Sequence, residues 1–204
     1  MSLKQIWLIR HGESRSQTAE EVGLDAALSI RGESQAARLQ SRLAEVTFDR
    51  VLVSPLQRAR QTFESAAVEC GTVLFDSRII ECSFGWSYET LLPYAPPPGA
   101  EPDPHDAWLT DPVERARSVC EELTSLDVQR ILLVGHWAIF NLVLQWFLGN
   151  PDPREPIRGQ TQRSAVMDNC GISILGIDDE RFGQCLLGWN DTRHVEDLLD
   201  DRAV

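Results

Sequence analysis

Short apolar runs alternate with stretches of helical periodicity along this chain. The runs lie at residues 5–9, 50–53, 73–75, 130–134, 172–177 and 185–187. Turn residues or charges bound each run, which is typical of β-strands. The near-continuous hydrophobicity of WLI, VLV and ILLV indicates central strands covered on both faces. The alternation predicts an α/β fold with three layers, α/β/α, around a mostly parallel central sheet.

Two helix starts are marked by the local sequence. Ser54-Pro55-Leu56-Gln57 places serine at the N-cap and proline at the first helical position. Asp111-Pro112 repeats that arrangement, and Val113 then begins an apolar stripe at helical spacing. Two further helices are predicted over residues 32–45 and 138–148.

Residues 83–106 interrupt this alternation. The segment contains Trp86, Tyr88 and Tyr94 together with the run Pro96-Pro97-Pro98-Gly99. A loop of this length without a regular pattern is usually functional or disordered, and its aromatic residues favour an ordered lid. These aromatics either line a substrate pocket or pack the lid onto the domain. We therefore expect one domain over residues 1–204, with a lid-like insertion at about 83–110.

Composition limits the classes of function. The 204 residues carry a net charge of −12, which argues against binding nucleic acid, because phosphate backbones are bound by basic surfaces. The same charge repels an anionic substrate, so a phosphate enzyme would need a local cluster of Arg and His. The five cysteines form no C-x-x-C pair, which indicates a reducing compartment. Without a signal peptide or an apolar run of membrane-spanning length, we expect a cytoplasmic protein with no membrane partner.

The first strand ends in residues suited to phosphate chemistry. Arg10-His11-Gly12 follows it directly, at the rim where open α/β sheets bind ligands. Arg10 can hold phosphate through two parallel hydrogen bonds, and Gly12 lets the backbone approach a ligand closely. Neutral imidazole accepts a phosphoryl group, and neighbouring guanidinium groups would favour the neutral form of His11. A histidine that is hydrogen-bonded only for packing is the alternative.

Two other strand ends carry comparable residues. Arg58 lies in the first turn of a predicted helix, where free N–H groups attract anions and a cation needs a compensating anion. Arg60 is more typical of a surface charge. His136 follows Val134-Gly135, so two of the four histidines in the chain occupy equivalent positions after strands. Each of these signals is weak when taken alone.

Together the blocks resemble the histidine phosphatase superfamily, in its phosphoglycerate-mutase-like branch, over nearly the whole chain. They are LIRHGES at 8–14, LSIRGESQA at 28–36, SPLQRARQT at 54–62, Glu81 in RIIECSFG, VGH at 134–136 and NDTRH at 190–194. The order and spacing of the blocks are more specific than any one of them.

The resemblance implies a role for each matching position. His11 would become phosphorylated, while Arg10, Arg58 and His136 would hold the phosphoryl oxygens. Glu81 would protonate the leaving oxygen and then activate water; partial burial beside Cys82 and Phe84 would help it to keep its proton. From its local sequence alone, Glu81 is typical of a surface carboxylate. The resemblance implies no metal and no cofactor.

Three departures from the family pattern put the substrate in doubt. Gln17 stands where the family often has Asn, although its amide can still donate a hydrogen bond to a substrate. Trp137 replaces a common Gly after the second histidine and would narrow or cover the pocket. Gly85-Trp86-Ser87-Tyr88 replaces the usual W-E-G after the acid.

The sequence therefore predicts a phosphomonoesterase that hydrolyses a small phosphorylated metabolite through a covalent phosphohistidine. One alternative is phosphoryl transfer of the phosphoglycerate mutase type, although the mutases of this family are usually longer. The other alternative is a non-catalytic protein that binds a phosphorylated ligand. The presence of all five candidate residues argues against it. The sequence leaves the substrate and the oligomeric state open.

Overall fold

The computed structural model describes residues 3–21, 23, 25–82, 111–150, 165–178 and 183–199. The strands within these ranges are β1 (Lys4–Arg10), β2 (Thr47–Val53), β3 (Glu69–Phe75), β4 (Arg130–Gly135), β5 (Ile172–Asp178) and β6 (Gly183–Asp191). The α-helices are α1 (Ile30–Leu43), α2 (Gln57–Ala66), α4 (Pro112–Ser125) and α5 (Trp137–Phe147). Two short 3₁₀ turns, η1 (Ser77–Ile79) and η4 (Glu196–Leu198), complete these elements.

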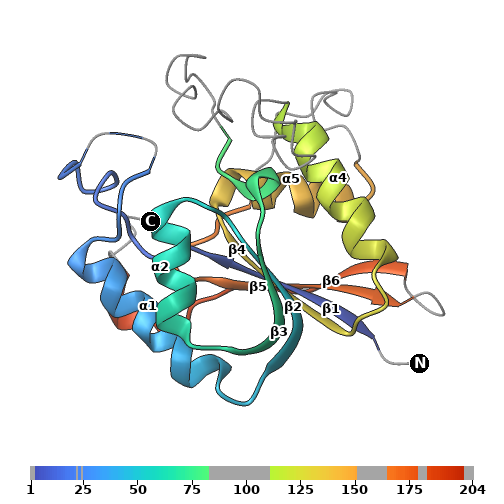
Figure 1. The fold of residues 1–204 in the computed structure, drawn as a ribbon, viewed down its shortest axis with the longest axis horizontal. Helices are drawn as coiled ribbons and strands as arrows, with labels where there is room; N and C mark the ends of the chain where they lie inside the picture. Colours follow the sequence, from blue (N-terminus) through green and yellow to red (C-terminus); the bar gives the residue numbers. More distant parts are fainter. Residues whose placement is uncertain are drawn as a thin grey trace.

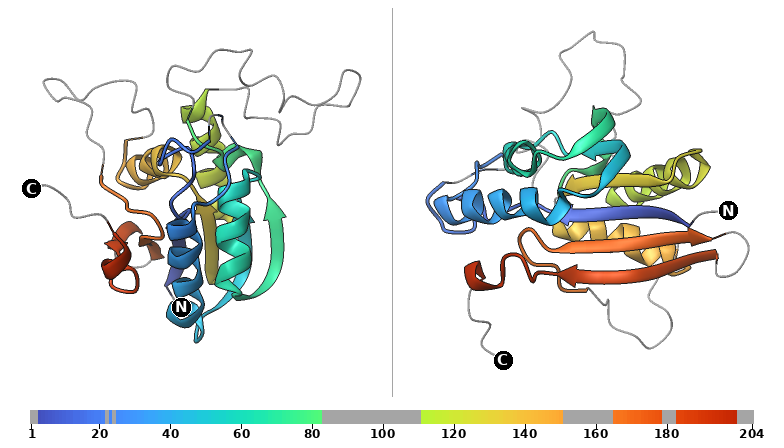
Figure 2. Two further views of the ribbon diagram at one scale, coloured as in Figure 1. Left: turned by 90° about the vertical axis from the view of Figure 1, so that its left-hand side faces the viewer. Right: turned by 90° about the horizontal axis from the view of Figure 1, so that it is seen from below.

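The strands form one sheet in the order β3-β2-β4-β1-β5-β6. The four strands from β3 to β1 are parallel, whereas β5 pairs with β1 and β6 pairs with β5 in the antiparallel sense. Figure 2 shows β5 and β6, in orange and red, side by side next to β1. The predicted mostly parallel sheet is confirmed, and each of the six apolar runs lies on one of its strands.

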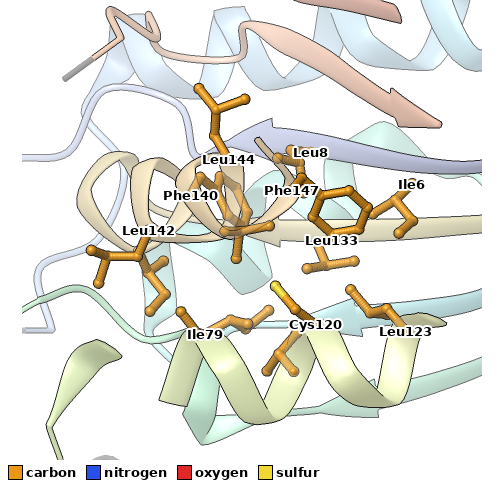
Figure 3. Packing of buried hydrophobic residues seen from close by; sticks show 14 of the residues in the cluster. Ile6, Leu8, Ile79, Cys120, Leu123, Leu133, Phe140, Leu142, Leu144 and Phe147 are labelled. Atoms are coloured by element: carbon orange, nitrogen blue, oxygen red, sulfur yellow. The ribbon is translucent and has the colours of Figure 1, made fainter. Parts of the chain in front are cut away.

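Helices cover both faces of the sheet (Figure 1). Alternate residues of a strand point to opposite faces. Ile6 and Leu8 of β1 therefore pack with α4 and α5, while Trp7 and Ile9 pack with α1 and α2. Figure 3 shows the first of these two cores, to which α5 contributes Phe140 and other apolar side chains. Burial on both faces explains why the strand runs are continuously apolar, and the three-layer prediction is confirmed.

The two predicted helix starts had different outcomes. Helix α4 begins as predicted, with Pro112 in its first turn and the Asp111 carboxylate accepting a hydrogen bond of 2.8 Å from the N–H of Val113. The prediction for α2 is wrong, because this helix begins at Gln57 with Leu56 at the N-cap. Asp25, from a distant segment, accepts the hydrogen bond from the Gln57 N–H at 2.6 Å. A tertiary contact thus takes over the capping role.

The predicted lid at about 83–110, with Trp86, Tyr88 and Tyr94, lies outside the described residues. Within the ranges that are described, no helix has the length and apolar character needed to cross a bilayer. The five cysteines are free thiols, of which Cys82, Cys120 and Cys170 are buried.

Candidate functional site

Three neighbouring parallel strands bring the site residues together. β2, β4 and β1 are adjacent in the sheet, and their register aligns Arg10 with Gly135. The residues that directly follow β2, β4 and β1 are Ser54, His136 and His11, respectively. The backbone N–H of His11 donates to the Gly135 carbonyl at 2.9 Å, so the ladder continues one residue past β1. This register explains why two histidines distant in sequence meet, with ring centroids 5.0 Å apart.

The hydrogen bonds of His11 define which ring nitrogen carries the proton. Its Nδ1 lies 2.6 Å from the Gly12 carbonyl oxygen, which can only accept, so Nδ1 is the protonated nitrogen. Its Nε2 accepts a hydrogen bond of 3.2 Å from Nε of Arg58, and a guanidinium can only donate. His11 thus presents the lone pair of Nε2 toward the arginine, in the form that a nucleophile requires.

Burial keeps both site histidines neutral. His11 is 3% exposed and His136 is fully buried. Burial, followed by the positive charges of Arg58 and Arg10, lowers the pKa of His11 well below its ordinary value. The pKa of His136 is lowered in the same way, first by burial and then by Arg58. The sequence had indicated only the contribution of the arginines, because the depth of the site depends on the packed helices.

This pair of histidines gives a pH-dependent stability. Lowering the pH from about 7.5 to about 5.5 is expected to reduce the free energy of unfolding by about 2–3 kcal/mol through these two groups. The unfolded chain binds protons on both imidazoles below their ordinary pKa, whereas the folded chain does so only at much lower pH. Their effect is therefore negligible above pH ~7 and grows as the pH falls. Urea unfolding of the wild type and of the double variant His11→Asn, His136→Asn measures it; equal pH dependences would contradict the assignment.

The two arginines approach the site from different elements. Arg10 ends β1, and its Nη1 donates to the Met167 carbonyl at 2.6 Å. Its buried Nε has no hydrogen-bond partner among the described residues. Arg58, only 5% exposed, stands on the first turn of α2 as the sequence predicted. Both side chains therefore lie beside His11 with donor groups suited to the oxygens of a phosphoryl group.

The Glu81 side chain contacts the N-terminal end of α5. Its Oε1 accepts hydrogen bonds from the N–H of Cys82 at 2.9 Å and from the N–H of Ala138 at 3.1 Å. Its charge also interacts with Arg10. The buried Arg115 holds the backbone on which Glu81 stands, because its guanidinium donates to the carbonyl oxygens of Arg78 and Ile80. The sequence gave no indication of this role for Arg115.

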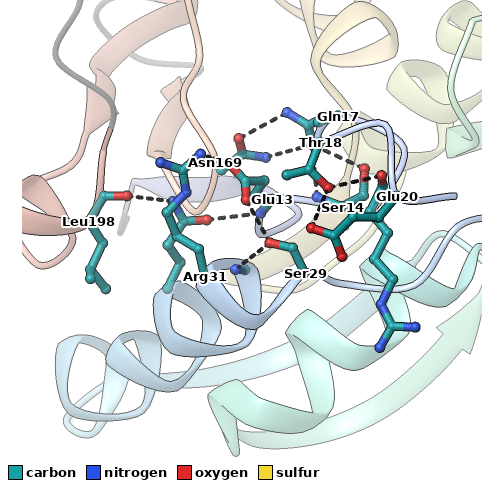
Figure 4. A network of polar contacts seen from close by, with 12 residues as sticks. Glu13, Ser14, Gln17, Thr18, Glu20, Ser29, Arg31, Asn169 and Leu198 are labelled. Carbon is teal, nitrogen blue, oxygen red and sulfur yellow. Dashed lines mark hydrogen bonds and ion pairs between the residues drawn. The ribbon is translucent and has the colours of Figure 1, made fainter.

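Gln17 lies in a network of side-chain hydrogen bonds (Figure 4). Its Oε1 accepts from the N–H of Ser14 at 3.0 Å, and its Nε2 donates to Oδ1 of Asn169 at 3.1 Å. Asn169 in turn donates to the His11 carbonyl at 2.9 Å. Gln17 is thus tied to the backbone of the candidate nucleophile. Sequence reasoning missed Asn169, because nothing in its neighbourhood distinguishes it from a loop residue.

The loop after His11 is pressed against the start of α1. A Cβ added to Gly32 would lie 1.9 Å from the carbonyl oxygen of Glu13, and one added to Gly12 would lie 2.6 Å from that of Gly32. Ser29 caps α1 and also donates to the Glu13 carboxylate at 2.6 Å, while Arg31 forms an ion pair with the same carboxylate (Figure 4). Gly12 is therefore required by packing, in addition to the backbone approach that the sequence suggested.

Trp137 is hydrogen-bonded to the segment from Ala165 to Met167, which in turn contacts Arg10. Its indole N–H donates to the Ala165 carbonyl at 2.9 Å, although 36% of the residue remains exposed. The Asn141 side chain also donates a hydrogen bond to the Ala165 carbonyl and accepts one from the Ala165 N–H. Two residues farther on, Met167 receives the hydrogen bond from Arg10. The structure thus places Trp137 beside His136 and gives its ring a contact that the sequence did not predict.

The five candidate residues Arg10, His11, Arg58, Glu81 and His136 thus gather at one edge of the sheet. Within the part of the chain that the structure describes, no cluster of three His, Cys, Asp or Glu side chains is arranged to hold a metal ion. What the site offers is two neutral imidazoles, two guanidinium groups and one carboxylate. This combination can bind a phosphoryl group, accept it on nitrogen and move a proton.

The chain belongs to the histidine phosphatase superfamily, branch 1, whose family model matches residues 6–192. The resemblance read from the sequence blocks is confirmed.

Its relatives include proteins named as mutases and as phosphatases. A probable phosphoglycerate mutase, GpmB, of Erwinia tasmaniensis is 27% identical over 218 aligned positions, which cover 97% of each chain. The structure of a putative alpha-ribazole-5'-P phosphatase from Escherichia coli matches with a TM-score of 0.64 and 23% identity, over 93% of this chain and 98% of that chain. Phosphoserine phosphatase from Entamoeba histolytica in complex with 3-phosphoglyceric acid matches with a TM-score of 0.62 and 19% identity, over 94% and 99%. These structural matches support the fold.

Proposed function

We propose that the chain is a phosphomonoesterase that hydrolyses a small phosphorylated metabolite through a covalent phosphohistidine at Nε2 of His11. The observation that carries this proposal is the neutral, buried imidazole with its proton on Nδ1 and its other nitrogen against Arg58. A ring fixed in this way is ready to attack phosphorus without first losing a proton.

The first step transfers the phosphoryl group. The Nε2 lone pair of His11 forms a bond to phosphorus while the ester P–O bond breaks and its electron pair stays on the leaving oxygen. Glu81 donates a proton to that oxygen, so the product leaves as an alcohol. Arg10, Arg58 and His136 stabilise the negative charge on the phosphoryl oxygens, since their donors are already held in a buried site before the reaction.

The second step restores the enzyme. A water molecule attacks phosphorus and gives a proton to the Glu81 carboxylate, which lost one in the first step. The N–P bond breaks, and its electron pair returns to Nε2 of His11. Inorganic phosphate leaves, so each group is back in its starting protonation state. The chain's own residues therefore balance the reaction without a metal or a cofactor.

The relatives support a small phosphorylated ligand. The Entamoeba histolytica phosphatase has been solved in complex with phosphoserine and with 3-phosphoglyceric acid. We further propose cytoplasmic localisation and no nucleic-acid partner, which the free thiols and the net charge of −12 support. Phosphoryl transfer of the mutase type is the second candidate, favoured by the name of the 27% identical relative.

Phosphate release tests the proposal directly. The wild type is expected to release phosphate from a generic aryl phosphate at an unchanged rate after EDTA treatment, because no step uses a metal. The reaction is followed by a colorimetric phosphate assay, and a panel of phosphorylated metabolites then defines the substrate. Absence of turnover on every ester would reject the hydrolase, and a phosphoglycerate mutase assay would then test the second candidate.

Arg58 and Arg60 offer a matched pair of arginines on one helix. Arg58→Met is expected to lower kcat/KM by about 10²–10³-fold, because a donor to the transition-state oxygens is lost. Arg60→Met should leave kcat/KM within about twofold, because Arg60 is exposed and stacks over the ring of Phe75. Steady-state kinetics on one aryl phosphate compares the two variants, and equal losses would show that Arg58 has no special contact with the phosphoryl group.

A further inference from the structure

Ser54 and His136 form a buried pair between two neighbouring strands. Ser54 follows β2 and His136 follows β4, and neither residue is exposed. The backbone N–H of Ser54 donates to the Val134 carbonyl at 2.9 Å, which fixes its place in the sheet. Its Oγ lies 2.7 Å from Nε2 of His136, a length typical of a well-formed hydrogen bond. Which of the two atoms supplies the hydrogen depends on the tautomer of His136.

The surroundings of the serine hydroxyl decide the direction of that bond. Its oxygen already accepts a long hydrogen bond of 3.4 Å from the N–H of Leu56. The hydrogen of a buried hydroxyl needs an acceptor, since water cannot supply one. Nε2 of His136 is placed to be that acceptor. If Nε2 carried the proton instead, the serine hydrogen would have to find another acceptor inside the packed sheet.

We propose that Ser54 is a positioning residue whose hydroxyl donates to Nε2 of His136 and thereby places the ring proton on Nδ1. That nitrogen is buried and has no hydrogen-bond partner among the described residues. The ring of His136 lies 5.0 Å from that of His11, which places the ring itself within the site. The part of the proposal that concerns phosphoryl oxygens rests on the proposed function, whereas the tautomer itself does not.

The two histidines then perform opposite tasks with the same tautomer. The Gly12 carbonyl holds the proton of His11 on Nδ1, which leaves the Nε2 lone pair available as a nucleophile. Ser54 holds the proton of His136 on Nδ1, which leaves an N–H donor for a phosphoryl oxygen. A phosphoryl oxygen can only accept, so the other tautomer of His136 would turn a lone pair toward it. The neutral form of His136, maintained by burial, makes this choice decisive.

Nitrogen-15 NMR of the labelled protein reports the tautomer without any substrate. Correlation of the ring nitrogens with the ring carbon-bound protons distinguishes a protonated nitrogen from an unprotonated one, and the signals of His136 are assigned by their loss in His136→Asn. The wild type, Ser54→Ala and Ser54→Thr are compared near neutral pH. Ser173→Ala is the control, because Ser173 is equally buried and its Oγ accepts a hydrogen bond from Asn190.

The wild type is expected to show His136 protonated at Nδ1 only. Ser54→Ala should shift part of the population to Nε2–H and lower kcat/KM by about three- to tenfold, the value of one neutral hydrogen bond. Ser54→Thr should restore both readouts toward the wild type, and Ser173→Ala should change neither. A wild-type spectrum with the proton on Nε2, or an unchanged tautomer in folded Ser54→Ala, overturns the proposal. The wild-type spectrum decides the direction of the bond even if the alanine variant does not fold. If neither the wild type nor any variant turns over a phosphate ester, but the tautomers are as expected, the proposed function is rejected while the role of Ser54 is supported.

Discussion

Replacement of His11 by asparagine is expected to lower kcat/KM for phosphate release by about 10⁴-fold or more, as loss of a nucleophile does in other enzymes. Asparagine fills a similar volume but has no lone pair on nitrogen that can attack phosphorus. The chemical intermediate gives a second readout. Wild-type protein quenched in alkali during turnover of a ³²P-labelled ester should retain label that is stable to base and released by acid, as a phosphohistidine is. His11→Asn should retain none.

The control for this prediction is His105→Asn, because His105 lies in the proline-rich segment, where the sequence favours a surface histidine over a catalytic one. It should retain both the turnover and the label. Residual turnover of His11→Asn within about tenfold of the wild type would contradict nucleophilic catalysis by His11, since removal of the nucleophile cannot be so mild. Label that survives in His11→Asn would place the covalent intermediate on another residue.

Glu81→Gln is expected to give the second-largest loss, and the loss should depend on the leaving group. For an alkyl phosphate, kcat should fall by about 10²–10⁴-fold, because glutamine cannot protonate the poorly leaving alkoxide. For an aryl phosphate, whose phenolate leaves without a proton, the first step should be nearly unaffected. Rapid-quench kinetics should then show a burst of phenol, because attack by water still lacks its base.

Glu114→Gln serves as the matched control for Glu81. Glu114 is half-exposed on α4, where it forms an ion pair with Arg117. The same change of carboxylate to amide there should leave the kinetics with both substrates unchanged. Equal losses in the rate of the first step for alkyl and aryl esters in Glu81→Gln would contradict proton donation. They would assign Glu81 a role in positioning the start of α5, where its carboxylate accepts from the Ala138 N–H.

The fold was predictable because its strands are covered on both faces. Six apolar runs marked six strands, although β2 and β3 begin earlier than their runs, at Thr47 and Glu69. These first residues are polar and exposed, so hydrophobicity does not reveal them. The start of α2 was not predictable. The hydroxyl of Ser54 contacts His136, and Asp25 supplies the cap, and both contacts depend on the tertiary fold.

The site was predictable where its residues follow strands, and not where they support other residues. Arg10, His11 and His136 stand at the ends of apolar runs, which is a local signal. Asn169 and Arg115 act on the backbone of distant segments, and no local pattern marks a side chain that binds a carbonyl oxygen. The depth of the site was also hidden, because it results from helices packed over both faces. The largest cause of the lowered histidine pKa values was therefore missed.

The contact between Gly12 and Gly32 restricts how this protein can change its specificity. Backbone atoms fill the space where a side chain at either position would lie, so a substitution must move the nucleophile loop or α1. Such variants would lose activity toward every ester alike instead of exchanging one substrate for another. The two segments are therefore packed as a single unit. A library designed to alter substrate choice should leave both glycines untouched and place its diversity in other parts of the chain.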